Sequence, residues 1–177
     1  MNSRMLGILC MVGGAVMIVA SFIWGSFTDT GGIIAGILWG VGSIAGLVGL
    51  IQLGALGESP ITRALGFVPI IGFALLIVGS ILQLAGIADD QSWLFGVGWI
   101  VQMAGMVLVG ILVIAAKRWR GWRRFAPLLA ILIVPVAFGL YQVFDQAIGI
   151  FYAAWILLGY AVATADPAPT VERSVAV

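Results

Sequence analysis

Few residues in this 177-residue chain could carry out chemistry on a substrate or bind a metal. The chain has no histidine and a single cysteine, Cys10. General acid–base catalysis, nucleophilic catalysis and zinc binding all depend on clusters of histidine, cysteine or carboxylate side chains. Asp89 and Asp90 are neighbours in one short loop, which we interpret as a water-exposed turn. The sequence therefore predicts a protein that is not an enzyme and that holds no cofactor and no metal.

Basic residues are concentrated in the segment KRWRGWRR, residues 117–124. The simplest interpretation is an anchor that fixes the orientation of the chain in a membrane, with Trp119 and Trp122 in the headgroup layer. The alternative is contact with anionic lipid or a protein partner, because clustered cations beside a membrane attract anionic lipid. Nucleic-acid binding is not expected, because eight residues between two helix ends provide no domain that could read a groove. The five cations concerned are Lys117, Arg118, Arg120, Arg123 and Arg124.

Three tryptophans, Trp39, Trp99 and Trp155, lie deep within apolar segments. A position eight residues into a helix is roughly 12 Å below its end, which is deeper than the usual aromatic belt of a membrane protein. One interpretation is packing, in which each indole N–H finds a carbonyl or a polar neighbour such as Ser43 or Gln102. The other is a cavity for an apolar ligand such as a lipid tail, a quinone or a carotenoid.

The elements that carry these residues are predicted to be membrane-spanning helices. Apolar residues make up 63% of the chain and charged residues 8%, proportions that do not suit a soluble domain. Each of six segments without Asp, Glu, Lys or Arg is long enough for a spanning helix, which needs roughly 17–25 residues. The sequence thus predicts an all-α membrane protein with six transmembrane helices. The segments are 5–24, 31–53, 64–87, 93–116, 125–144 and 147–163.

The loops between these segments predict the orientation of the chain. All eight basic residues fall on one side, whereas the loops on the opposite side contain Asp29, Asp89, Asp90 and Asp145 and no basic residue. The positive-inside rule then puts both termini in the cytoplasm.

Two recurrences suggest that the chain is built from tandem repeats. Seven residues between Arg4 and Ser21 recur 59 positions later, and each of the three tryptophans follows an aspartate by ten positions. We expect three helical hairpins, 4–53, 63–116 and 124–163, of which the third has diverged. They form one domain, 1–163, followed by a polar cytoplasmic tail, 164–177.

Glycines at four-residue spacing predict close helix contacts on two sides of the second helix. Intramolecular packing is the ordinary interpretation. Two such sides exceed what a single neighbour requires, so the second side could receive another membrane protein subunit. The two sets are Gly32, Gly36 and Gly40, and Gly42 and Gly46.

Three motifs carry a resemblance to known proteins. WLFGVGW from Trp93, RRFAPLL from Arg123 and WILLGY from Trp155 resemble small, uncharacterised six-helix membrane proteins of bacteria. The Arg-x-Leu-Gly openings at Arg4 and Arg63 are distantly similar to HdeD-type acid-resistance membrane proteins, which are built from short hairpin repeats. The resemblance implies a bacterial cytoplasmic (inner) membrane protein and supplies no binding residue.

Two functional hypotheses follow. The favoured one is an accessory or scaffold subunit that packs against other membrane proteins or lipids, suggested by the glycine sets, the basic segment and the lack of catalytic residues. The alternative is a small permease or apolar-ligand-binding bundle, suggested by the hairpins and the deep tryptophans. A permease requires Gln102, Ser43 and the tryptophans to converge on a cavity, whereas a scaffold leaves that interior filled.

Overall fold

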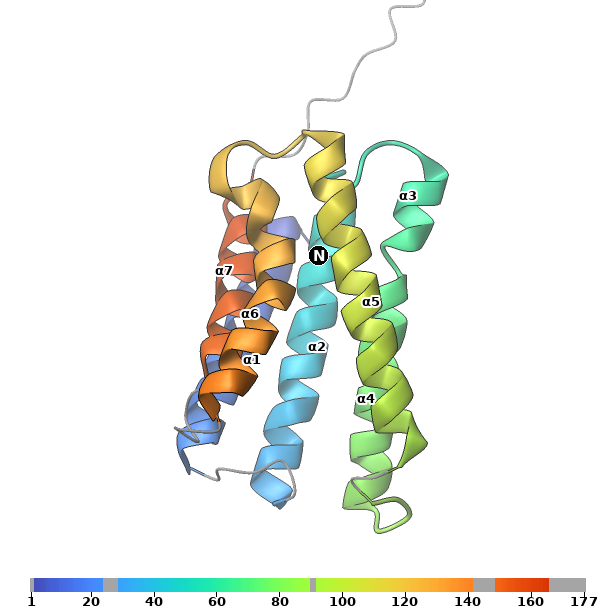
Figure 1. The fold of residues 1–177 in the computed structure, drawn as a ribbon, viewed down its shortest axis with the longest axis vertical. Coiled ribbons are helices and arrows are strands. Elements are labelled where there is room, and N and C mark those ends of the chain that lie inside the picture. Colours follow the sequence, from blue (N-terminus) through green and yellow to red (C-terminus); the bar gives the residue numbers. More distant parts are fainter. Residues whose placement is uncertain (1, 24–28, 90–91, 142–148, 166–177) are drawn as a thin grey trace, which may run out of the picture.

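The computed structural model describes residues 2–23, 29–89, 92–141 and 149–165, and the regular elements within these ranges are all helices (Figure 1). A short helix, α3 (Pro60–Leu65), and a 3-10 helix, η1 (Gly121–Phe125), lie in two of the connections. Six longer helices correspond to the six segments that were predicted to be transmembrane helices. They are α1 (Ser3–Ile23), α2 (Thr30–Gln52), α4 (Val68–Leu84), α5 (Trp93–Ala116), α6 (Ala126–Tyr141) and α7 (Gly149–Ala163).

The long helices pack side by side in a ring that follows the order of the chain. Each helix contacts the next one, α7 closes the ring by packing extensively against α1, and α2 also contacts α7. Figure 1 shows that the starts of α2, α5 and α7 lie at one end of the bundle, while α3 and η1 lie at the other. Residues near the middle of each helix can therefore meet in the interior.

Charged residues divide between the two ends of the bundle. Arg4 in the first turn of α1, Arg63 on α3 and the segment 117–124 around η1 lie at one end, which we name the basic end. Asp29 and Asp89, which precede α2 and α5, lie at the other, which we name the acidic end. Asp90 and Asp145 fall outside the described residues.

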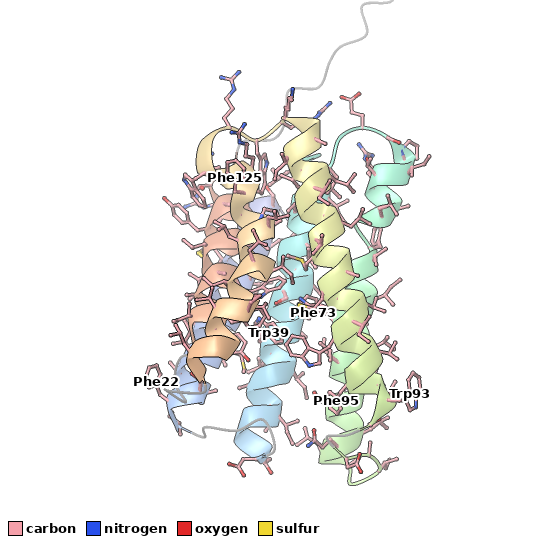
Figure 2. All side chains as sticks on the ribbon, in the orientation of Figure 1. Phe22, Trp39, Phe73, Trp93, Phe95 and Phe125 are labelled. Carbon is pink, nitrogen blue, oxygen red and sulfur yellow. The ribbon has the colours of Figure 1, made fainter. Side chains whose placement is uncertain are left out.

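The outer surface of the bundle has the character of a membrane protein. Four stretches are long and apolar enough to cross a membrane, namely α1, α2, α3 with α4 (Pro60–Leu84) and α5, and α7 is a shorter apolar helix. Large apolar side chains point outward from every long helix (Figure 2). Such a surface suits lipid rather than water. Examples are Val12, Leu38, Ile71, Ile100, Leu132 and Leu157.

Glycines allow α1 to approach its two neighbours closely. A Cβ atom placed on Gly42 of α2 would lie 2.7 Å from the carbonyl oxygen of Leu9, and one on Gly7 would lie 2.5 Å from the carbonyl oxygen of Gly159 in α7. Real Cβ atoms do not approach backbone this closely. Backbone-to-backbone contact of this kind is the usual way in which membrane helices associate.

The two glycine sets of α2 face two neighbours within the same chain. Gly42 and Gly46 face α1, where a Cβ on Gly46 would lie 2.7 Å from the sulfur of Cys10. Gly40 faces Ile77 of α4 at 2.9 Å, and Gly32 is buried. Gly36 differs from the expectation, because a Cβ there would meet nothing within 4 Å. Gly36 lies between Gly32 and Gly40 on the helix surface, so its open surroundings reflect the local spacing of the neighbouring helices rather than its angular position.

The predicted third helix, 64–87, is two helices rather than one. α3 ends at Leu65, and α4 begins at Val68 and ends at Leu84. The break has a local cause: Pro69 lacks an N–H, and its ring would clash with the carbonyl of residue i−4 in a continuous helix, which is Leu65. Hydropathy alone does not register this break, because the residues on both sides of it are apolar.

Candidate functional site

The centre of the bundle is occupied by a cluster of aromatic rings around Trp39 (Figure 2). The ring centroid of Trp39 lies 6.2 Å from that of Trp99 and 5.9 Å from that of Trp155. Phe73 lies 5.2 Å from Trp39 and 5.1 Å from Trp155, in edge-on arrangements that aromatic pairs favour. The three tryptophans singled out in the sequence therefore come together, from α2, α5 and α7.

Helical spacing explains how α7 contributes three of the six rings in the cluster. Phe151 and Tyr152 precede Trp155 by four and three positions, so all three share one face of the helix. The ring of Trp39 lies 5.7 Å from that of Phe151 and 5.3 Å from that of Tyr152. This face of α7 is completely buried.

Polar side chains lie one turn from the tryptophans, toward the basic end. Ser43 follows Trp39 by four positions on α2, and Gln102 follows Trp99 by three on α5. Their exposed fractions are 1% and 0%, and they are the buried polar side chains of the described structure. The side chains that could provide polarity in the interior are thus adjacent to the aromatic cluster on two of its helices.

Five polar atoms of these side chains have no hydrogen-bond partner in the described structure. They are the indole nitrogens of Trp39 and Trp155, the hydroxyl oxygen of Ser43, and both the nitrogen and the oxygen of the Gln102 amide. The expectation that each indole N–H finds a carbonyl, Ser43 or Gln102 is therefore wrong for Trp39 and Trp155. An unsatisfied buried polar group costs about 1–3 kcal/mol, so five together are a strong reason to seek a partner.

The donor and acceptor character of these five atoms limits which groups could form hydrogen bonds with them. Two indole N–H groups and the amide NH₂ group donate, whereas the amide oxygen accepts and the serine hydroxyl can do either. The six apolar segments contain no Asp, Glu, Lys or Arg that could neutralise a charged group at this depth. Neutral hydrogen-bonding groups, rather than ions, therefore match these polar atoms.

Cys10 is part of the structural core beside this cluster. Its thiol is 1% exposed and donates a hydrogen bond to the carbonyl oxygen of Trp155 at 3.4 Å. The interpretation of Cys10 as a small buried side chain is confirmed. Across the described ranges, no three His, Cys, Asp or Glu side chains come together in a group that could hold a metal ion.

The basic segment has contacts that the sequence did not reveal. Arg118 forms an ion pair with Glu58, with 2.6 Å between the guanidinium nitrogen and the carboxylate oxygen. Arg123 donates to the hydroxyl oxygen of Thr164 at 3.1 Å. Trp119 is 6% exposed and packs in the hydrophobic core, so its ring faces the protein rather than lipid.

Sequence reasoning missed several residues of both regions. Phe73, Phe151 and Tyr152 stand in apolar runs where nothing distinguishes them from lipid-facing residues, although the spacing of the last two from Trp155 is a usable signal. Glu58 and Thr164 are distant in sequence from the segment that they contact. Contacts of this kind depend on the folded arrangement of the helix ends.

The chain has sequence similarity to part of an efflux pump. No protein-family model matches the chain, and no solved structure matches it. The chain is similar to the efflux pump FUS6 of Gibberella moniliformis (strain M3125 / FGSC 7600), with 31% identity over 121 residues. The match covers 63% of this chain and 22% of that protein, so the chain spans about a fifth of the length of its relative. The resemblance to HdeD-type proteins stays a prediction.

Proposed function

We propose that this helical membrane protein is a non-catalytic, small permease-type bundle that binds a neutral molecule in its interior. The observation that carries the proposal is the set of five unpartnered polar atoms next to the aromatic cluster. Trp39, Trp99 and Trp155 form the walls of the site, and Ser43 and Gln102 orient the ligand. The similarity to part of an efflux pump supports this proposal over the accessory-subunit hypothesis.

A bound molecule accounts for polar groups that are otherwise unfavourable. Buried polar side chains in proteins nearly always have a partner, and exceptions need an explanation. A ligand with carbonyl or ether oxygens would accept from the two indole N–H groups and from the Gln102 amide. Its apolar body would lie against rings whose faces and edges attract such surfaces.

The accessory-subunit hypothesis loses part of one of the three observations that favoured it. The glycine sets on α2 suggested a face for another subunit, but Gly42 and Gly46 face α1 and Gly40 faces α4. The outward side chains described above are large and apolar, as lipid contact requires. A partner subunit is therefore not needed to explain Gly40, Gly42 and Gly46, whereas Gly36 has no contact within the chain.

The experiment that tests the proposal is extraction from native membranes in a mild detergent, followed by mass spectrometry of the small molecules that copurify. Gln102→Leu removes two of the five polar atoms, whereas Gln52→Leu makes the same change at an exposed position at the end of α2. We expect the wild-type chain and Gln52→Leu to retain one neutral compound stoichiometrically and Gln102→Leu to lose it. Equal retention by both variants, or a stoichiometric protein partner in place of a compound, would overturn the proposal.

We also propose that the basic end faces the cytoplasm, together with both termini. The distribution of charge supports this orientation, because basic residues favour the cytoplasmic side of spanning helices. Arg4, Arg63 and the segment 117–124 lie at that end, as do the start of α1 and the end of α7.

We also propose that the first two hairpins arose by tandem duplication. A Cβ on Gly13 would lie 3.3 Å from the Cα of Gly42, and a Cβ on Gly72 would lie 2.7 Å from the Cα of Gln102. The first members of these pairs differ by 59 positions (72 − 13) and the second by 60 (102 − 42). A similar contact between helices therefore recurs at nearly the same repeat distance, which supports duplication.

A further inference from the structure

The basic segment divides into cations with partners inside the protein and cations without them. Arg118 pairs with Glu58 and Arg123 bonds to Thr164. Lys117, Arg120 and Arg124 are exposed at the same end of the bundle. Within the described part of the chain, these three of the five positive charges have no ion-pair partner.

The backbone of the segment is held in a defined shape. Lys117 and Gly121 adopt left-handed conformations, with φ of 53° and 62°, and these bring the chain sharply round from α5 into η1. Between them, the buried indole of Trp119 anchors the segment in the core. The ion pair and the hydrogen bond fix it to the α2–α3 connection and to the residue after α7. The exposed cations therefore lie on a loop whose conformation is held by contacts with the rest of the protein.

An aromatic pair lies beside these cations. Trp122 stacks on Tyr160 of α7, with ring centroids 6.2 Å apart and an interplanar angle of 11°. Both rings are partly exposed, at 44% and 49%. Tryptophan and tyrosine with one apolar and one polar edge are typical of the layer where lipid headgroups meet acyl chains. The guanidinium of Arg124 lies over the ring of Phe125, 4.6 Å from its centroid.

The depth of the segment identifies the class of partner. α5 has 24 residues and is about 36 Å long, slightly more than the roughly 30 Å hydrocarbon core of a bilayer. Lys117 follows its last residue and so emerges in the headgroup layer. An anionic lipid phosphate is the negatively charged group found at this depth, whereas an acidic protein would have to approach from the aqueous phase.

We propose that Arg120 and Arg124 bind the headgroup phosphate of an anionic phospholipid, while the Trp122–Tyr160 pair packs against the start of its acyl chains. Guanidinium groups suit this role, because they donate in a fork that matches phosphate oxygens. This lipid site is separate from the interior site of the proposed function and does not depend on it.

The test is native mass spectrometry of the purified full chain in mild detergent, titrated with phosphatidylglycerol and, separately, with phosphatidylcholine. The variant Arg120→Gln/Arg124→Gln removes two charges from the site. The variant Arg4→Gln/Arg63→Gln removes two charges from the same end on α1 and α3, and both arginines are exposed. The two variants have the same net charge, so they separate a local site from a general attraction.

We expect the wild-type chain to prefer phosphatidylglycerol and the Arg120→Gln/Arg124→Gln variant to bind it about 30-fold more weakly, from the typical strength of a cation at an anionic membrane surface. The Arg4→Gln/Arg63→Gln variant should bind it nearly as well as the wild type. An equal loss in both variants would overturn the proposal, as would equal binding of the two lipids by the wild-type chain. All three proteins should elute alike on size exclusion, because the substituted side chains are on the surface.

Discussion

At the scale of single residues, the polar atoms of Trp39, Ser43, Gln102 and Trp155 set the chemistry of the interior. They are fully surrounded by protein and yet lack hydrogen bonds within the described structure. If the proposed ligand binds, such residues stabilise the ligand-bound protein and destabilise the ligand-free protein. The same atoms should therefore have opposite effects on ligand binding and on the stability of the ligand-free protein.

Replacement of Gln102 tests this opposition. Gln102→Leu removes an unsatisfied amide, so we expect the ligand-free protein to gain about 1–3 kcal/mol in its free energy of unfolding. Thermal unfolding in detergent, after delipidation and extraction of small molecules, measures the change. A fall in stability would mean that the amide has a structural partner, such as an ordered water molecule, and that it belongs to the packing.

At the scale of helices, glycines decide how closely each pair can approach. A Cβ on Gly72 of α4 would fall on the backbone nitrogen of Gln102 in α5, and one on Gly105 of α5 would lie 2.5 Å from the nitrogen of Pro69 in α4. These contacts hold α4 and α5 together and set the position of Gln102. The packing at Gly72 and the position of the Gln102 side chain are therefore linked.

Two alanine substitutions separate a contact glycine from a free one. Gly72→Ala should destabilise the protein by about 1–3 kcal/mol, because the added methyl group meets backbone that cannot move aside easily. Gly36→Ala meets open space and should be neutral or stabilise by up to about 1 kcal/mol, since alanine favours helix more than glycine does. Unfolding temperatures of the two variants in the same detergent provide the comparison, and equal losses would contradict the assigned contacts.

The sequence predicted the helices well because each is an unbroken apolar run bounded by polar residues. It did not predict the break between α3 and α4, since Pro69 interrupts hydrogen bonding without changing hydropathy. It also did not reveal that the ring of Trp119 is buried, because burial of a loop residue depends on how the neighbouring helices pack against it.

For the candidate site, the sequence predicted which residues could meet. It did not predict that some of their polar atoms have no hydrogen-bond partner in the described structure. The shared depth of Trp39, Trp99 and Trp155 follows from their spacing after the aspartates of the acidic end, although Asp145 lies outside the described residues. Whether their indole N–H groups find partners depends on distances of a few tenths of an ångström between helices. Such distances follow from side-chain packing, which a pattern along the chain does not specify.

At the scale of the whole molecule, charge and hydropathy divide the bundle into an apolar wall and two unlike ends. The basic end combines exposed cations with an aromatic pair, and the acidic end carries aspartates before α2 and α5. A structure with this polarity should insert in one orientation. The interior site then lies between two compartments rather than at one surface.

Cysteine labelling from either side of the membrane tests the orientation. Arg120→Cys should react with a membrane-impermeant maleimide only in inverted vesicles, and Asp89→Cys only in intact cells. Both residues are exposed, and the single native cysteine, Cys10, is 1% exposed and gives little background. Labelling of both variants from the same side would contradict the proposed topology.

The closure of the helix ring by α1 and α7 has a consequence for how the protein is made. Gly7 packs against Gly159, and these residues emerge from the ribosome roughly 8–30 s apart at typical rates of synthesis. During this interval the face of α1 that will receive α7 has only lipid as a neighbour. A nascent chain that stops before α7 therefore leaves the α7-contacting face of α1 exposed to lipid, where membrane quality control can recognise it. The packing of α1 is therefore complete only after α7 has been synthesised.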